Sequence, residues 1–193
     1  MITIRPETKH DVAAREALLD QAFGASRFVK TAQRLRDDRL PAEHLSFVAC
    51  EDGRLVGTVR LWDVTAGPGR PALLLGPLAV AQPCRGAGLG ARLIRHALAA
   101  AAARGDGAVL LVGDTSYYER FGFSAEKTGG LWLPGPYERH RLLGCELKPG
   151  GLDGAHGLVT PAGRPIPQPD LAATPTRLVV HDRASLRRAA RAR

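Results

Sequence analysis

The chain has 193 residues, of which 45% are hydrophobic and 24% charged, the size and balance of one globular domain with a full-sized core. No apolar run approaches the roughly 20 residues that a membrane span needs, and the start MITIRPETKHD lacks the apolar segment of a secretory signal, so we expect a cytoplasmic protein. The net charge of +8 is concentrated in the arginines of residues 177–193, so the body is only mildly basic and charge alone does not indicate a nucleic-acid-binding protein.

Local patterns predict the first elements. Residues 2–5 alternate apolar and polar side chains, as a strand does. Thr8 or Asp11 can cap a following helix, and Gly24 ends it. Residues 27–39 predict a second, strongly basic helix.

A hairpin comes next. Residues 46–51 and 54–63 have strand patterns, and the turn Asp52-Gly53 between them is typical of a two-residue hairpin. A loop rich in glycine and proline then spans residues 65–70.

The next stretch is the most informative. Residues 72–80 are almost continuously apolar, which predicts a central strand covered on both faces. Gly76 and Pro77 interrupt it, so we expect two neighbouring strands to separate there. The glycine-rich loop 85–90 then leads into a long helix. Because glycines let a ligand approach the backbone and a helix start offers free N–H groups and a favourable dipole, we expect a phosphate-bearing ligand.

The last elements of the core follow in order. Residues 108–112 predict an apolar strand, and Ser116 can cap a short helix over 117–120. Phe123 begins a further strand, and residues 139–147 form the last one.

From Pro149 the periodicity is lost, and we expect residues 149–193 to be an extension, Gly/Pro-rich and then Arg-rich, outside a domain of residues 1–148. Within it, residues 178–180 fit a short strand and residues 184–192 a basic helix.

Two common phosphate-binding loops can be compared with this one. A P-loop is excluded because no Gly-Lys-Ser/Thr follows. The dinucleotide fingerprint matches at Gly86-x-Gly88-x-x-Ala91. However, residues 81–85 separate that match from the strand, and the expected acidic residue after the next strand has no good counterpart.

The whole string LAVAQPCRGAGLG, residues 78–90, resembles the acyl-CoA-binding motif of the GNAT N-acetyltransferase superfamily, Q/R-x-x-G-x-G/A after a strand ending in LxV. Arg85, Gly88 and Gly90 match its defined positions. After the next strand, YERFGF from Tyr118 matches the family's Y-x-x-x-G-F pattern. LGPLAV, LLVGD and YYERFGF resemble the YhbS-like branch in particular, and the resemblance covers residues 2–147.

This resemblance implies an α/β fold (a three-layer α+β arrangement) with a GNAT-type mixed, splayed central sheet flanked by helices. It implies an acyltransferase, an acetyl-CoA-dependent N-acetyltransferase that moves the acetyl group of this co-substrate to a primary amine by direct attack in a ternary complex. Backbone N–H groups would hold the pyrophosphate and the strand edge would pair with the pantetheine. The residues expected to bind coenzyme A are Leu78, Ala79, Val80, Arg85, Gly86, Ala87, Gly88, Leu89, Gly90, Ala91, Ser116 and Tyr118.

The resemblance also implies roles at the reacting end. The backbone N–H of Leu78 would stabilise the oxyanion, and Tyr118 would be the general acid that protonates the leaving thiolate. Tyr117 is a neighbouring alternative donor. The family often places a Glu on the central strand to serve as base, but residues 73–80 contain no acid, which leaves four candidates open: Asp114, Glu51, Asp63 and His44.

In this fold, the first two helices and the loops near the thioester determine which acceptor binds; here these are about residues 22–44 and 131–140. The candidate residues to line the acceptor pocket are Phe23, Phe28, Trp132 and Tyr137. The expected partners are acetyl-CoA and a small amine or peptide amine; a homodimer stays open, and we expect neither membrane nor nucleic acid. Three cysteines and six scattered histidines form no ligand cluster, so no metal is expected. The alternative function is a non-catalytic acyl-CoA-binding module whose basic tail contacts nucleic acid or a partner protein.

Overall fold

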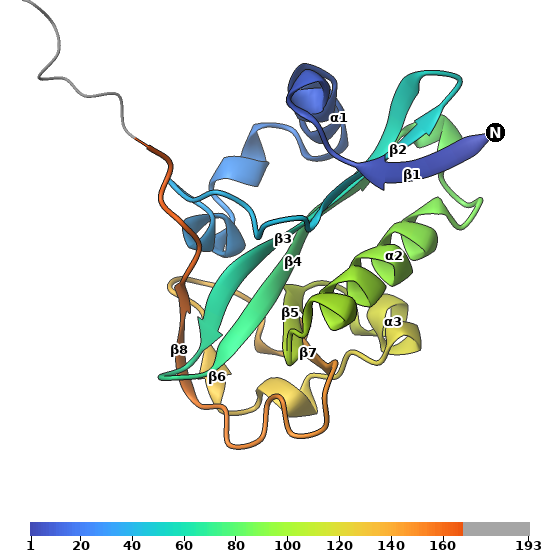
Figure 1. Cartoon of the computed structure of the whole chain (residues 1–193). Coiled ribbons are helices and arrows are strands. Elements are labelled where there is room, and N and C mark those ends of the chain that lie inside the picture. The colour runs from blue at the N-terminus through green and yellow to red at the C-terminus, as the bar shows by residue number, and fades with distance from the viewer. Residues whose placement is uncertain (168–193) are drawn as a thin grey trace, which may run out of the picture.

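The fold is built on one mixed sheet with a long strand at its centre. The strands are β1 (Ile2–Pro6), β2 (Ser46–Glu51), β3 (Arg54–Ala66), β4 (Pro71–Val80), β5 (Ala108–Val112), β6 (Leu131–Trp132), β7 (Leu142–Glu146) and β8 (Gly157–Pro161). The computed structural model describes residues 1–167, in which the sheet order is β1-β2-β3-β4-β5-β7, with β8 beside β3 and β6 beside β8 (Figure 1). Only the pairs β4–β5 and β6–β8 are parallel among these strands.

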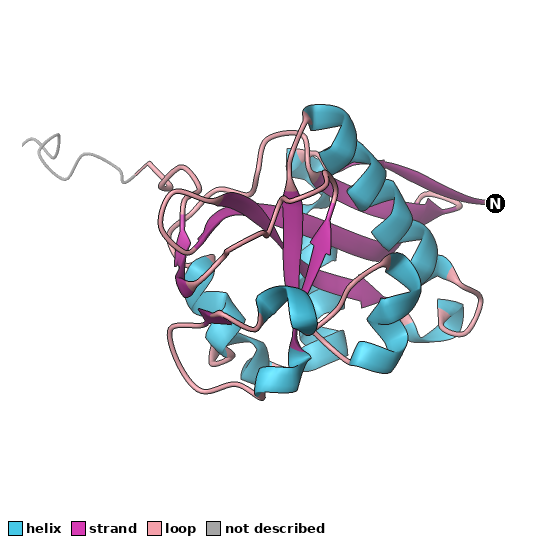
Figure 2. Cartoon of the chain, turned by 90° about the horizontal axis from the view of Figure 1, so that it is seen from below, coloured by secondary structure: helices cyan, strands magenta, loops and turns pink. Residues whose placement is uncertain are grey.

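Two helices cover opposite faces of this sheet, α1 (Val12–Phe23) and α2 (Leu89–Arg104); α3 (Thr115–Tyr118) is a single short turn (Figures 1 and 2). Leu18 and Leu19 of α1 pack with Ala79 of β4, whereas Leu93 and Ile94 of α2 belong to the larger core on the other face. The predicted α/β architecture, a mixed sheet flanked by helices, is therefore confirmed.

Strands β4 and β5 separate after a short paired stretch. Their parallel register joins only Leu73 with Val109 and Leu74 with Leu110. From Leu78 to Val80, β4 pairs with β3 alone among the described strands. The separation predicted near Gly76 and Pro77 is present, and it opens one edge of β4.

The predicted helix over residues 27–39 is wrong. The chain forms two 3₁₀ segments instead, Ala25–Phe28 and Thr31–Leu35. Leu35 is buried while Phe28 and Val29 are exposed, so this stretch has no continuous apolar stripe that a longer helix could bury against the sheet.

Two strand predictions also needed correction. Phe123 does not begin a strand; the backbone there makes only an isolated bridge between Ser124 and Gly144. Residues Arg139–Arg141 form a 3₁₀ turn, so the last predicted strand is shortened to β7.

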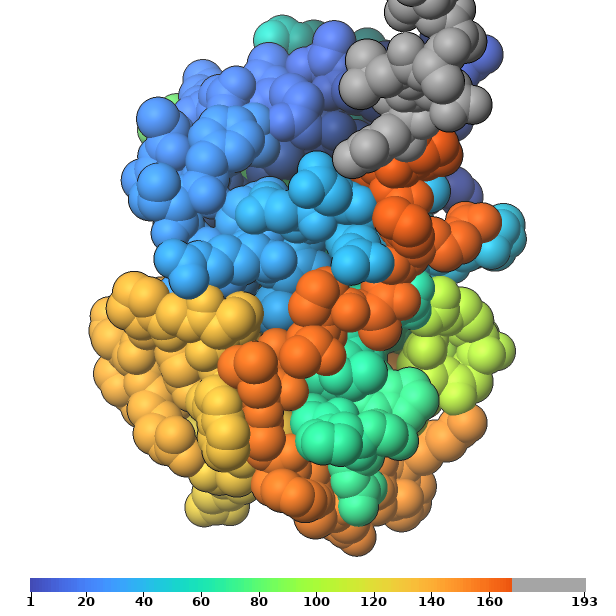
Figure 3. Space-filling view, turned by 90° about the vertical axis from the view of Figure 1, so that its left-hand side faces the viewer, coloured from blue at the N-terminus to red at the C-terminus, as the bar shows by residue number. Residues whose placement is uncertain are grey.

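The expected extension begins as part of the sheet rather than as a tail. Strand β8 pairs with the second half of β3, beyond the part that β2 covers, and Val159 is fully buried there. Figure 3 shows this C-terminal segment in orange, crossing the face between the gold loop that follows β6 and the teal turn between β3 and β4. Pairing protects the edge that β3 would otherwise expose. The strand and helix predicted at 178–180 and 184–192 lie outside the described residues.

No helix within residues 1–167 is long and apolar enough to cross a membrane.

Candidate active site

The glycine loop forms an open cradle at the start of α2. Gly86 and Gly88 have φ values of +81° and +77°, and a Cβ added to either would meet no atom within 4 Å. Leu89 is buried and anchors the helix start in the core. The backbone N–H groups from Gly86 to Ala91 donate to no acceptor within the described part of the chain. Consecutive free donors at a helix start, with space in front of them, suit a phosphate.

The open edge of β4 leads away from this cradle. Leu78, Ala79 and Val80 pair with β3 on one side, and no described strand pairs with their other side. Arg85 is exposed beside them, and its Nε donates to the Val80 carbonyl at 3.1 Å. An extended ligand arm can pair with such an edge as an added strand would.

A cleft of about 510 Å³ opens at the β4 bend. Its walls come from Leu75–Leu78 of β4, the end of β5, the 3₁₀ segments between residues 23 and 36, and the loop 136–141. Leu78 and Tyr118, which we assigned to the reacting end, both line it. The cradle and the cleft therefore lie toward two ends of the same open edge.

Close packing fixes the position of Tyr118. Its ring lies so close to Gly113 that a Cβ there would be 2.3 Å from Cε2, and it makes edge contacts with Tyr117 and Phe123 at centroid distances of 5.0 and 5.9 Å. Burial raises the pKa of Tyr118 to about 12; Tyr117 adds to this shift and Arg141 opposes it. The hydroxyl is therefore protonated at neutral pH, as a proton donor must be.

The alternative donor, Tyr117, faces elsewhere. Its hydroxyl lies 3.0 Å from the position that a Cβ on Gly90 would occupy, and Arg120 stacks over its ring at 4.6 Å. Tyr117 does not line the cleft. Tyr117 therefore lies beside the glycine loop, whereas Tyr118 lines the cleft.

Of the four candidate bases, Asp114 alone lines the cleft. Its Oδ1 accepts hydrogen bonds from the backbone N–H and Oγ of Ser116, at 3.0 and 2.9 Å. Asp114, rather than Ser116, is therefore the cap of α3. The other candidates lie elsewhere: Asp63 pairs with an arginine of α2, Glu51 lies at the β2–β3 hairpin, and His44 is exposed.

Of the four aromatic residues predicted to line the acceptor pocket, two line the cleft and two do not. Phe23 and Tyr137 line the cleft, whereas Phe28 and Trp132 do not and are largely exposed. Sequence patterns do not identify the charged residues of the cleft, because these residues lie in 3₁₀ segments and loops instead of the regular elements that the patterns predict. These charged lining residues are Arg27, Lys30, Arg36, Glu138 and Arg141.

Long-range hydrogen bonds fix two walls of the cleft to each other. Thr31 Oγ1 donates to the carbonyl of Pro136, and Arg34 Nη1 donates to the carbonyl of Pro134 at 2.7 Å. These contacts join segments about a hundred residues apart in the chain.

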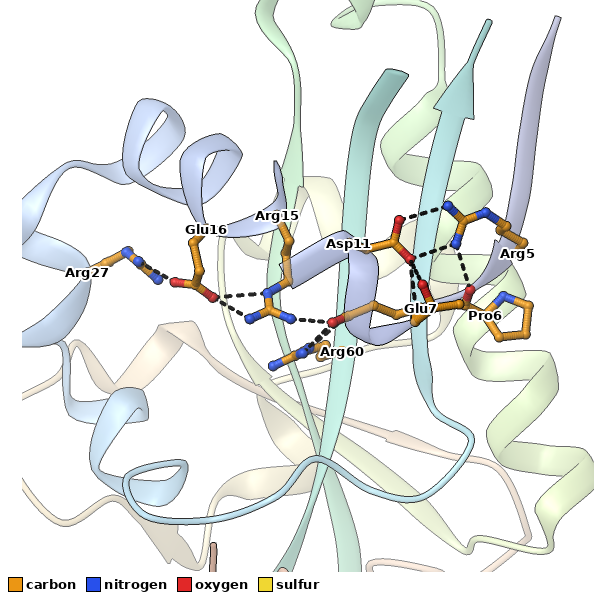
Figure 4. A network of polar contacts seen from close by, with 9 residues as sticks. Arg5, Pro6, Glu7, Asp11, Arg15, Glu16, Arg27 and Arg60 are labelled. Atoms are coloured by element: carbon orange, nitrogen blue, oxygen red, sulfur yellow. Dashed lines mark hydrogen bonds and ion pairs between the residues drawn. The ribbon is translucent and has the colours of Figure 1, made fainter. Parts of the chain in front are cut away.

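A chain of ion pairs holds the first 3₁₀ segment of the cleft wall, Ala25–Phe28, in place (Figure 4). Arg27 Nη2 donates to Glu16 at 2.6 Å, and Glu16 also accepts from Arg15. Arg15 in turn pairs with the buried Glu7, which accepts from Arg60 Nε at 2.8 Å. The network ties the first 3₁₀ segment to α1 and to the centre of the sheet.

Comparison with known proteins adds four findings. A family model described as the acetyltransferase (GNAT) family matches residues 13–123. The uncharacterized N-acetyltransferase YhbS of Escherichia coli K12 is 31% identical over 158 residues, which cover 81% of this chain and 93% of YhbS. A crystal structure of E. coli YhbS in complex with CoA superimposes with a TM-score of 0.71 at 30% identity, over 82% of this chain and 88% of that one. A GNAT family acetyltransferase of Brucella melitensis, in complex with acetyl-CoA, gives a TM-score of 0.55 at 28% identity, over 74% and 94% of the two chains.

Proposed function

The chain belongs to the acetyltransferase (GNAT) family, and we propose that it moves the acetyl group of acetyl-CoA to a primary amine by direct attack in a ternary complex. The observation that carries this proposal is the open edge of β4, which runs from the free N–H groups of the glycine loop to a cleft that contains Leu78 and Tyr118. The YhbS and Brucella structures, crystallised with CoA and acetyl-CoA, support the same ligand.

The donor half of the site would be held mainly by backbone. The N–H groups from Gly86 to Ala91 would bind the pyrophosphate, and Arg85 would add a positive charge. The edge from Leu78 to Val80 would pair with the pantetheine amides. The open space in front of Gly86 and Gly88 fits a ligand that approaches the backbone closely.

The acceptor amine would enter from the cleft and attack the thioester carbonyl of bound acetyl-CoA. The Leu78 N–H would donate to the developing oxyanion, the usual way in which a backbone amide lowers such a barrier. A C–N bond forms, the C–S bond breaks, and Tyr118 protonates the departing thiolate. Asp114 accepts the proton that the amine loses, directly or through water.

A thiol-release assay over a panel of amines tests this proposal. We expect turnover by the wild type, and Tyr118→Phe should lower kcat by about 10²-fold or more with little change in acetyl-CoA affinity. Tyr117→Phe is the matched comparison, because it removes the neighbouring hydroxyl, and its effect should fall on acetyl-CoA affinity rather than on kcat.

Tight acetyl-CoA binding without turnover of any amine would contradict the enzyme and favour the binding-module alternative. A large loss of kcat in Tyr117→Phe, with none in Tyr118→Phe, would move the proton donor to Tyr117.

A further inference from the structure

Arg36 is a charged side chain in the cleft to which the mechanism gives no role. It follows the 3₁₀ segment Thr31–Leu35, whose buried Leu35 anchors it beside the sheet. Its Nη1 lies 3.8 Å from the position that a Cβ on Gly76 would take, so the guanidinium reaches the bend of β4. Its Nε is buried and has no hydrogen-bond partner among the described residues.

The other arginines of the cleft have acidic partners, and Arg36 differs from them. Arg27 pairs with Glu16 and Asp20, and Arg141 has Glu138 at 3.7 Å. Within residues 1–167, Arg36 makes no ion pair at all.

Burial lowers the pKa of Arg36 to about 10, with nearby Arg27 adding to the shift and Asp37 opposing it, so the side chain is still a cation at neutral pH. A desolvated cation without a counterion is unfavourable, and folded proteins normally pair such a group.

We propose that the acceptor is a primary amine with a carboxylate a few bonds from its amino group, and that the Arg36 guanidinium binds this carboxylate. A guanidinium can bind a carboxylate through two parallel N–H···O bonds, and the Nη1 end of Arg36 is the part that reaches the bend of β4. This assignment rests on the acetyl transfer proposed above.

The position of Arg36 sets the length of the acceptor. Gly76, next to its Nη1, is two residues from Leu78, where the thioester carbonyl would lie. At about 3.3 Å per strand residue, the Cα atoms of Gly76 and Leu78 are at most about 7 Å apart. The span from Arg36 to the thioester also contains one N–H···O bond and the distance between the amine and the carbonyl that it attacks, so only a few bonds separate the carboxylate from the amine. A free amino acid meets this condition, whereas the side chain of a protein lysine has no carboxylate so close to its amine.

Paired acceptors test the proposal directly. The kcat/KM of the wild type is measured for a panel of amino acids and for their uncharged α-amides, which have the same size and the same amine. We expect the wild type to prefer the free acids. Arg36→Met should lower kcat/KM for the acids by about 30-fold or more, while kcat/KM for the amides should stay within a few-fold of the wild-type value. Arg36→Lys keeps the charge but not the two-bonded geometry, so its kcat/KM for the acids should lie between the values of the wild type and Arg36→Met.

Two controls complete the experiment. Arg54→Met removes the same charge from the exposed β2–β3 hairpin and should leave the preference intact. Acetyl-CoA affinity and urea unfolding of each variant separate a lost substrate contact from a damaged fold.

The outcomes distinguish this proposal from the acetyl transfer beneath it. Equal use of acids and amides by the wild type, an equal loss for both in Arg36→Met, or a preference for phosphoethanolamine would overturn the carboxylate assignment while leaving an active acetyltransferase. If the wild type turns over no amine, calorimetry of the CoA-bound protein with N-acetyl amino acids and their amides decides: acid-selective binding lost in Arg36→Met supports the carboxylate site, and its absence overturns it.

Discussion

Gly113→Ala tests whether the placement of Tyr118 governs the reaction. The new Cβ would lie 2.3 Å from Cε2 and 2.7 Å from Cδ2 of Tyr118. Carbon atoms in contact prefer about 3.5 Å or more, so the ring must move by about 1 Å. Gly113 has no positive φ, so alanine adds this clash without backbone strain.

The consequences have a calculable size. Displacing a reacting group by about 1 Å can lower the rate by about 10²-fold, and overpacking of this kind lowers the free energy of unfolding by about 1–3 kcal/mol. We therefore expect Gly113→Ala to approach Tyr118→Phe in kcat, with acetyl-CoA affinity little changed. Steady-state kinetics and urea unfolding measure the two effects.

A double-mutant cycle isolates the contact. With Tyr118→Ala as the background, only the milder contact of the new Cβ with Leu111 Cδ1, at 3.0 Å, remains. Gly113→Ala should then lower the free energy of unfolding by about 1 kcal/mol less than it does in the wild type. Wild-type kcat in Gly113→Ala, or the same loss of stability in both backgrounds, would refute this reasoning.

Further predictions concern the ends of the site and its protons. Truncation after residue 167 should leave a folded protein that binds acetyl-CoA, whereas truncation after Gly150 should abolish cooperative unfolding, since it removes β8 and its buried core residue; a cooperative thermal melt of the shorter chain would contradict this. Gly88→Leu should lower acetyl-CoA affinity by about 10-fold or more without changing the circular dichroism, because a side chain would enter the cradle, and an unchanged Kd by calorimetry would count against that site. Asp114→Asn should keep the cap of α3 but lower kcat by about 10²-fold, and an unaltered pH–rate profile would exclude Asp114 as the base. Tyr118 loses its proton only as the pH approaches about 12, so its ionisation should cause no fall in kcat between pH 7 and 10, and a falling limb there that Tyr118→Phe removes would contradict the burial argument.

The geometry of the proposed donor half of the site could be predicted from the sequence because its determinants are local. An anion cradle needs glycines at positive φ followed directly by a helix, and residues 85–90 contain both signals in six positions. The central strand β4 was equally clear, since a continuous apolar run of this length is typical of a strand covered on both faces, and its interruption at Gly76 marks the bend.

The acceptor half depends on contacts that no local pattern contains. Thr31 and Arg34 are fixed by carbonyls of the loop 134–136, and β8 is fixed by the second half of β3. A helix was therefore predicted where 3₁₀ turns occur, and β8 was missed because a strand of five residues between glycine and proline has no distinguishing periodicity.

Because no local sequence pattern describes the acceptor half, the class of acceptor has to be inferred from the charged side chains of the cleft. Backbone N–H groups can bind a phosphate wherever a glycine-rich loop leads into a helix. The glycine motif therefore indicates a phosphate-bearing acetyl donor but gives no information about the acceptor amine. On the other side of the thioester position, the fold pairs Arg27 with acidic residues of α1 and leaves Arg36 without a counterion in residues 1–167. An unneutralised, desolvated cation raises the free energy of the empty site, and an acceptor that carries a carboxylate would offset part of that when it binds. The proposed acceptor class therefore rests on a partly buried arginine in the cleft that makes no ion pair within residues 1–167.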